Sequence, residues 1–395
     1  MFSAVLLKAK HKYQTRTMKY ENALSFAKEL DNKDELKSFR SKFYIPEIND
    51  KLSIYFTGNS LGLQPKATAQ YIQQELKDWA ELGVEGHFKA KHPWFSYHEI
   101  FPTQLSKIVG ALPEEVVVMN QLTVNLHLLL TTFYRPTKER FKIICEAKAF
   151  PSDQYALESQ IKLHGLNPDE VLIEIEPRDN YIIENKDIIA AIQKHGKETA
   201  LVLFGAVNYY NGQVFNMEEI TKAAHEAGAY CGFDLAHAAG NIELKLHDWN
   251  VDFGCWCSYK YLNSGPGGVA GVFIHQKHAK NISLPRLAGW WGYEKDTRFQ
   301  MDKGFKPINT AEGWQLSNAP VLSMAAHKAS LDIFEEANME RLVRKGKQLS
   351  GYLLFILNEI NNKLGKKIIQ IITPVDDIER GCQVSMIMLE NGKAV

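Results

Sequence analysis

Length, composition and charge narrow the class of protein. The chain has 395 residues, of which 45% are hydrophobic, and 46 lysines and arginines balance 46 aspartates and glutamates. This composition excludes a disordered or collagen-like chain, and the zero formal charge argues against nucleic acid or an anionic membrane as the main partner. No apolar run approaches the roughly 18 residues that span a bilayer. We expect a globular small-molecule enzyme, with a large domain and a smaller companion, or two to three domains.

The first 20 residues are basic. Lys8, Lys10, Lys12 and Arg16 precede the first acidic residue, Glu21. This faintly resembles an organelle-targeting segment, but its apolar part is too short for a secretory signal. We interpret the stretch as a basic tail before a second possible start at Met18.

The five cysteines predict free thiols. Their number is odd and most lie in apolar runs, so we expect no disulfide framework and a cytoplasmic location. Cys255 and Cys257 are separated by one residue, whereas zinc and redox pairs usually have at least two between them. We therefore predict alternate residues of a buried strand and no metal site.

From residue 64 onward, helical and strand patterns alternate. The first helical stretch, residues 66–82, places Tyr71, Ile72, Leu76 and Trp79 on one face. Short apolar runs predict strands at residues 116–118, 142–144, 171–173, 201–203, 230–233 and 269–274. Helical patterns separate several of them, at residues 124–133, 152–163, 186–195 and 217–227. This order indicates an α/β fold with a mostly parallel sheet, helices on both faces, and sites at the carboxyl ends of the strands.

A smaller α+β domain is predicted after about residue 316. Long helical patterns cover residues 321–336 and 339–360, and strand-like patterns cover residues 367–372 and 383–389. We predict a tail and a segment of the small domain in residues 1–63, the large domain in residues 64–315, and the small domain in residues 316–395.

The most informative segment surrounds Lys260. This lysine follows a predicted strand, lies between Tyr259 and Tyr261, and precedes a glycine-rich turn. A surface lysine beside a hairpin turn would give the same pattern, but the setting also suits a Schiff base. Asp234 ends an apolar strand 26 residues earlier, and a carboxylate buried there needs a cationic partner. Pyridoxal phosphate chemistry requires this pair, because Asp234 would keep the pyridine nitrogen protonated while Lys260 holds the aldehyde.

Two strand-to-helix junctions offer further cofactor contacts. Thr123 lies where a strand gives way to a helix, so it can cap the helix, bind a phosphate, or do both. Phe150 precedes another helix and can stack on a flat ring. Ser152 and Asp153 can equally be simple helix caps. Tyr259 could add a phenolic donor to the phosphate.

Together these strings resemble the kynureninase family, fold-type-I pyridoxal phosphate enzymes of the aminotransferase superfamily. The resemblance runs from about Phe43 to the last residues. Its markers are the segments 55–63 (YFTGNSLGL), 122–127 (LTVNLH), 150–153 (FPSD), 233–237 (FDLAH), 256–262 (WCSYKYL) and 290–292 (WWG).

The resemblance implies a homodimer with active sites at the subunit interface. The implied reaction is hydrolysis of L-kynurenine or 3-hydroxy-L-kynurenine to L-alanine and anthranilate or 3-hydroxyanthranilate. Lys260, Asp234 and Tyr259 would be catalytic, with Tyr259 relaying protons at the carbonyl. The substrate's aromatic ring would meet His87, Ser317 and Asn318. The cofactor would be bound by Leu122, Thr123, Phe150, Pro151, Ser152, Asp153, Gly205, Asp234, His237, Tyr259, Lys260, Trp290 and Asn318.

The sequence departs from the family pattern in two places. Gly205 stands where many relatives carry a serine, and loss of one hydroxyl would weaken cofactor binding by about 1 kcal/mol. Relatives also continue for some tens of residues beyond Val395, and there carry an arginine that clamps the substrate's α-carboxylate. We expect the 395-residue chain to bind the cofactor but to turn over kynurenine poorly. Arg380 is expected to buttress the small domain rather than to replace that arginine.

Two alternatives remain open at this point. The same fold carries cysteine desulfurases and aminotransferases, although a desulfurase needs a reactive cysteine on a mobile loop. The other alternative is a non-catalytic protein that keeps the cofactor-binding residues and acts by binding or dimerising.

Overall fold

A computed structural model of the protein describes residues 19–178 and 181–394. The basic stretch up to Met18 lies outside these residues, so its interpretation as a tail stays a prediction. Among the described helices, none combines the length and the apolar character that crossing a bilayer would require.

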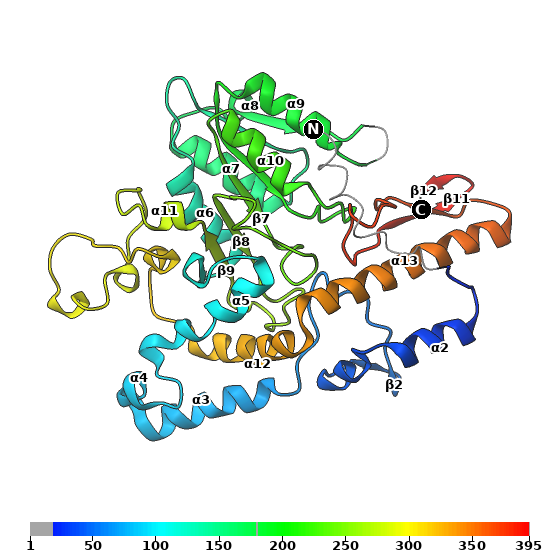
Figure 1. Cartoon of the computed structure of the whole chain (residues 1–395), viewed down its shortest axis with the longest axis horizontal. Coiled ribbons are helices and arrows are strands. Elements are labelled where there is room, and N and C mark those ends of the chain that lie inside the picture. The colour runs from blue at the N-terminus through cyan, green and yellow to red at the C-terminus, as the bar shows by residue number, and fades with distance from the viewer. Residues whose placement is uncertain (1–18, 179–180, 395) are drawn as a thin grey trace, which may run out of the picture.

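A seven-stranded sheet lies at the centre of the large domain (Figure 1). Its strands are β3 (Val116–Val118), β4 (Lys142–Glu146), β5 (Leu172–Ile175), β6 (Thr199–Gly205), β7 (Tyr230–Asp234), β8 (Phe253–Trp256) and β9 (Gly271–Ile274). Their spatial order is β3-β9-β8-β7-β6-β4-β5. The run from β8 to β5 is parallel, whereas β9 is antiparallel to both of its neighbours. The predicted mostly parallel sheet is confirmed.

Helices cover both faces of this sheet. They are α5 (Pro102–Val109), α6 (Leu122–Phe133), α7 (Pro151–Leu163), α8 (Pro168–Val171), α9 (Asn185–His195), α10 (Met217–Glu226), α11 (Gln276–Ala279) and α12 (Val321–Ala337). Helix α3 (Thr68–Leu82) packs on α12, and α4 (Gly86–Lys89) packs on α3. Successive strand residues point to opposite faces. Val202 and Phe204 of β6 therefore join a core with α5, α9, α10 and α12, while Leu201 and Leu203 join a second core with α6 and α7.

Local sequence signals explain one shifted boundary. A strand was predicted from Val171, but β5 begins at Leu172 because α8 comes first. Pro168 occupies the first turn of this short helix, and the side chain of Asn167 accepts a hydrogen bond from the backbone N–H of Asp169 at 3.2 Å. A proline after a side-chain cap is a typical helix start.

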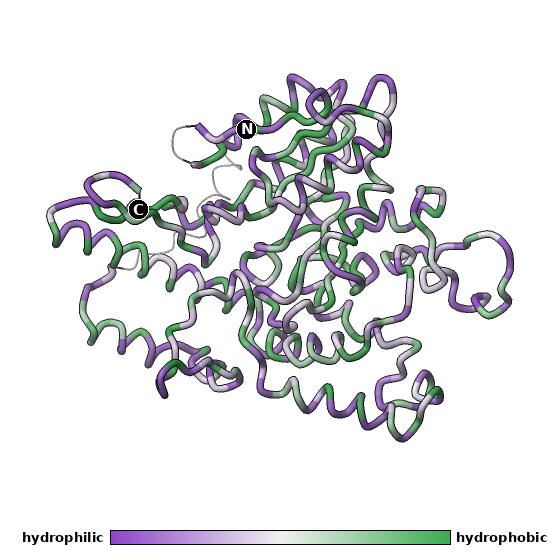
Figure 2. The backbone as a smooth tube through the Cα atoms, turned by 180° about the vertical axis from the view of Figure 1, so that it is seen from behind, coloured by the Kyte–Doolittle hydropathy of each residue, from purple (hydrophilic) through white to green (hydrophobic). Residues whose placement is uncertain are grey.

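The C-terminal part packs against residues from the beginning of the described chain. Helix α13 (Met339–Leu364) lies beside the strands β10 (Ile369–Ile371), β11 (Met386–Glu390) and β12 (Lys393–Ala394) and above α2 (Leu24–Lys33) (Figure 1). Ion pairs join Lys345 to Asp34 and Arg344 to Glu35. A small hairpin, β1 (Glu47–Ile48) and β2 (Lys51–Leu52), follows α2. Figure 2 shows hydrophobic and hydrophilic residues alternating along α3 and α13, as expected for helices that pack on one side. The domain boundaries remain a prediction.

Candidate active site

The carboxyl ends of β4, β6 and β7 meet at one edge of the sheet, where they form a pocket with the loop after β8. The pocket is lined by Leu122, Thr123, Glu146, Phe150, Ser152, Asp153, Gly205, Val207, Tyr209, Asp234, Ala236, His237, Cys257, Tyr259 and Lys260. Every residue predicted to bind the cofactor lines it, except Pro151, Trp290 and Asn318. Segments more than a hundred positions apart in the sequence thus converge where parallel sheets place their ligands.

Lys260 points its amine into the middle of this pocket. Its Nζ lies 3.0 Å from His237 Nε2 and 5.6 Å from the centre of the Phe150 ring. Burial, together with the charge of Lys260, lowers the pKa of His237 to about 4. The imidazole is therefore neutral at physiological pH and accepts a hydrogen bond from the lysine at Nε2. Phe150 is 44% exposed, so one face of its ring remains available for stacking.

Two buried carboxyl groups, Asp153 and Asp234, form a pair deeper in the pocket. Asp234 accepts a 2.6 Å hydrogen bond from the backbone N–H of Ala236. Burial raises the pKa of both carboxyls, and the charge of Asp234 raises that of Asp153 further. Within the described part of the chain, Asp153 Oδ1 has no hydrogen-bond partner.

The pocket also offers donors for an anion. Leu122 and Thr123 form the first turn of α6, where backbone N–H groups have no partner within the helix. Burial raises the pKa of Tyr259 to about 12, so its hydroxyl stays protonated and can donate. Anion donors, an exposed aromatic face, a lysine and a carboxyl pair in one pocket fit pyridoxal phosphate.

Five residues of the pocket were not among the predicted site residues: Glu146, Val207, Tyr209, Ala236 and Cys257. Ala236 and Cys257 lie in the segments 233–237 and 256–262 that carried the resemblance. Glu146 is the last residue of β4, and a charged residue at the end of an apolar strand was the signal that could have identified it. Val207 and Tyr209 lie in the loop after β6, for which the sequence carried no comparable signal.

The remaining predicted residues do not reach the pocket within one chain. Pro151 occupies the first position of α7, next to residues that line it. Trp290 donates from Nε1 to the carbonyl of Arg298 at 3.2 Å, and Ser317 and Asn318 are exposed. His87 lies in α4 with its ring against Trp94, at 5.6 Å between centroids. Their proposed roles remain predictions.

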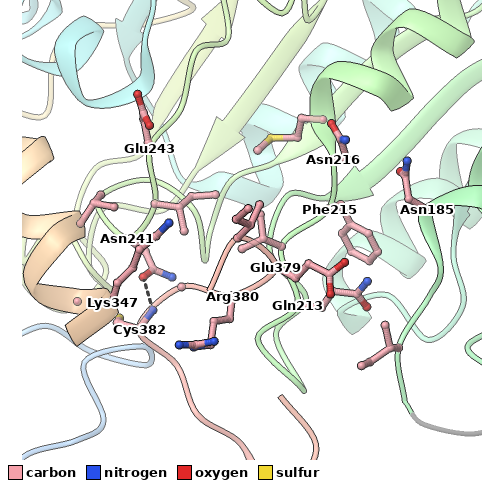
Figure 3. A pocket seen from close by; sticks show the side chains of 18 of the residues that line it. Asn185, Gln213, Phe215, Asn216, Asn241, Glu243, Lys347, Glu379, Arg380 and Cys382 are labelled. Atoms are coloured by element: carbon pink, nitrogen blue, oxygen red, sulfur yellow. Dashed lines mark hydrogen bonds between the residues drawn. The ribbon is translucent and has the colours of Figure 1, made fainter. Parts of the chain in front are cut away.

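Arg380 belongs to a different cavity, of about 490 Å³. Figure 3 shows it between Gln213, Phe215, Asn216 and Glu379 on one side and Lys347 and Cys382 on the other. The Arg380 guanidinium donates to the carbonyl of Val375 within the small domain. This contact agrees with the expectation that Arg380 buttresses that domain.

Comparison with known proteins defines the class first. Residues 54–368 match the family model of class-V aminotransferases. Among solved structures, a C-DES mutant with glycine covalently linked to its PLP cofactor superposes with a TM-score of 0.70 at 16% identity, covering 85% of this chain and 83% of that one. A cysteine desulfurase from Thermococcus onnurineus gives 0.66 at 20% identity, covering 84% and 78%. The chain is therefore a pyridoxal phosphate enzyme of fold type I.

Closer relatives give the particular family. The kynureninase of Flavobacterium psychrophilum is 54% identical over 379 residues, which cover 96% of this chain and 89% of that protein. The kynureninase of Rattus norvegicus is 48% identical, with 93% and 82% covered. The chain belongs to the kynureninase family.

Proposed function

We propose that this chain hydrolyses L-kynurenine and 3-hydroxy-L-kynurenine between Cβ and Cγ, giving L-alanine and anthranilate or 3-hydroxyanthranilate. Hydrolysis of kynurenine to anthranilate and alanine, a step of tryptophan catabolism towards NAD, follows from membership of the family. The proposal goes beyond family membership in naming 3-hydroxy-L-kynurenine as a second substrate. Its main support is the 54% identity to a kynureninase over nearly the whole chain, joined to a pocket that brings Lys260, Asp234 and Phe150 together.

Each residue of the pocket receives a role from its position. Pyridoxal phosphate, when bound, supplies an electron sink for negative charge that develops on the substrate. We assign Lys260 Nζ to hold the cofactor and, once the substrate's amino group has displaced it, to remove the Cα proton. Asp234 keeps the pyridine nitrogen protonated, and the Tyr259 hydroxyl moves a proton at the γ-carbonyl. Phe150 stacks on the ring, while Leu122, Thr123 and Tyr259 bind the phosphate.

The substrate's aromatic ring is assigned to His87, Ser317 and Asn318, with Trp290 and Asn318 completing the phosphate site. Since none of them lines the pocket of a single chain, we propose that a second subunit brings some of them there. Large apolar side chains on α3, α4 and the turn between them support a homodimer: Trp79 is 61% exposed, Val84 75% and Phe88 63%. Exposed apolar patches of this kind mark protein interfaces. The free thiols of all five cysteines support a cytoplasmic location.

The solved desulfurase structures do not favour a second function. At 14 to 20% identity they show the fold alone. Cys145, Cys231, Cys255 and Cys257 are buried, and burial raises the pKa of each thiol, to about 11 for Cys257. Buried thiols of high pKa are poor nucleophiles. Cys382 lies on the other cavity.

Product analysis tests the proposal. The purified chain, supplied with pyridoxal phosphate, is given kynurenine, 3-hydroxykynurenine or cysteine, and amines and sulfide are quantified. Equal amounts of alanine and anthranilate, or of alanine and 3-hydroxyanthranilate, are expected. With dithiothreitol present to reduce the transferred sulfur, sulfide and alanine from cysteine with no anthranilate from kynurenine would instead assign a desulfurase.

A further inference from the structure

Glu146 is a buried carboxyl in the pocket wall that the roles above leave unused. It ends β4 and is 4% exposed. One carboxyl oxygen accepts from the backbone N–H of Gly205 at 2.9 Å, and the other accepts from Asn208 Nδ2 at 2.7 Å. A Cβ at position 205 would lie 2.7 Å from Glu146 Oε1. Glycine at this position therefore allows the carboxyl to approach the end of β6.

Through Asn208, this carboxyl controls the loop that carries Tyr209. The Asn208 Oδ1 accepts from the backbone N–H groups of Tyr210, at 2.9 Å, and Asn211, at 3.1 Å, which fixes the turn. Tyr209 then packs edge-on against Phe150, with 5.2 Å between ring centroids and an angle of 83°. Gln383 of the small domain donates to the Tyr209 carbonyl at 2.9 Å. One loop thus contacts the strand edge, the predicted stacking ring and the small domain.

The surroundings of Glu146 shift its pKa so that the carboxyl gains or loses its proton near neutral pH. Burial and the charge of Asp234 on β7 raise its pKa to about 7, against the hydrogen bonds from Asn208 and Gly205, which lower it. Asp153 on α7 and Lys260 after β8 are the other charged groups of this pocket. The ionised carboxylate satisfies both donors, whereas protonation places a hydrogen on one oxygen and weakens that contact.

We propose that Glu146 is a positioning residue of the active site: its ionised carboxylate holds the Asn208 loop so that Tyr209 keeps Phe150 in place above Lys260. The inference rests on the proposed kynureninase activity, whose rate reports the alignment of Phe150 and the cofactor-binding lysine.

The pH profile of kcat/KM for kynurenine, measured between pH 5.5 and 9, tests this role. In the unchanged chain, kcat/KM is expected to rise as pH increases through about 7, because Glu146 ionises there. This rise is the acid limb of the pH profile. Glu146→Gln should remove this limb and lower kcat/KM at pH 8 by about tenfold, since one amide cannot accept both hydrogen bonds. Asn208→Ala should also remove this limb and lower kcat/KM at pH 8, because the ionised carboxylate then has no side chain of the loop to hold.

Glu115→Gln is the matched control. Glu115 is also fully buried and accepts from the backbone N–H groups of Leu112 and Gln276, but it precedes β3 at the opposite edge of the sheet. Its loss should lower the melting temperature and leave the limb in place. If Glu146→Gln or Asn208→Ala retains the limb at the same pH, the positioning role is wrong. If Glu146→Gln is insoluble, Asn208→Ala decides alone.

The two proposals fail in different ways. Absence of anthranilate from the unchanged chain overturns the kynureninase activity itself. Activity with a pH profile that neither variant alters overturns only the role of Glu146.

Discussion

Two regions of the active site differ in whether a single chain forms them. We call them the floor, at the ends of the strands, and the rim, whose residues are expected to contact the substrate's ring and the cofactor's phosphate. On the floor, Asp234, Asp153 and Lys260 lie together in a buried pocket whose walls are the ends of neighbouring strands. On the rim, His87 and Trp290 lie on short helices or loops away from that pocket. We therefore expect the chemistry to depend on the fold of one chain, and substrate recognition to depend on the second subunit proposed above.

Removing the lysine on the floor should have the largest effect. Lys260→Ala is expected to lower kcat by about 10³-fold or more, because the group that holds the cofactor and takes the proton is lost. Borohydride reduction followed by peptide mapping should place the cofactor on Lys260 in the unchanged chain. Lys222→Ala, on the exposed side of α10, is the control. Reduced cofactor on any other lysine would refute the assignment.

Asp234→Asn should follow, with a fall in kcat of about 10²-fold or more, because a neutral amide cannot keep the pyridine nitrogen protonated. Folding should be little affected, since burial disfavours the charge of Asp234, and that charge raises the pKa of the neighbouring Asp153. A helix cap alone would instead cost about 1 kcal/mol of stability and leave turnover intact. Measuring unfolding and turnover on the same preparation separates these outcomes.

An ion pair beside the rim should make stability depend on pH. Glu312 accepts from His98 Nε2 at 2.9 Å and from Lys295 at 2.7 Å, and these contacts outweigh burial and lower its pKa to about 2. Because the pKa of Glu312 is lower in the folded than in the unfolded chain, its ionised carboxylate stabilises the fold. This contribution is fully present above about pH 4.5 and is lost as the pH falls towards 2. Glu312→Gln should cost up to about 3 kcal/mol at pH 7.

Denaturation of both proteins across the acid range checks this sign. The difference in unfolding free energy between the unchanged chain and Glu312→Gln should shrink as the pH approaches 2. A difference that stays constant between pH 7 and pH 3 would show that the ion pair contributes nothing that depends on the charge of Glu312.

The smallest effect is expected on the rim. His87→Ala should reduce kcat/KM more for 3-hydroxykynurenine than for kynurenine, because the imidazole is expected near the added hydroxyl. A hydrogen bond of this kind contributes about 0.5 to 1.5 kcal/mol, or roughly two- to tenfold in selectivity. Equal losses on both substrates would make His87 a structural residue that packs against Trp94.

The floor could be predicted from the sequence because its signals are local. Apolar runs such as Val116–Val118 and Tyr230–Asp234 are strands in the structure. Asp234 ends one such strand, and Lys260 lies in the loop after another, β8. Strand ends in a parallel sheet meet at one edge whatever the lengths of the connections between them. The position of a residue after a strand was therefore enough to place it in the pocket.

The hydrogen-bond partners of Glu146 and the exposure of residues on α3 could not be predicted in this way. The contact of Glu146 with Gly205 depends on β4 and β6 being neighbours, which residue order does not specify. Similarly, the helical pattern placed Trp79 on one face with Tyr71 and Ile72, but only Tyr71 and Ile72 pack against the core. Helical periodicity predicts which residues share a face of a helix. It does not predict how much of that face is covered by other parts of the fold.

The ion pairs between α2 and α13 have a consequence for the order in which the protein forms during synthesis. Lys345 and Asp34 are 311 positions apart, whereas the last strand of the central sheet ends at Ile274. At typical rates of translation, the roughly 70 residues between Ile274 and Lys345 take about 4 to 14 seconds to be made. For that time α2, none of whose residues is fully buried even in the finished fold, has no α13 to dock on. We expect the sheet to assemble first, and the start of the described chain to join the molecule among its last events.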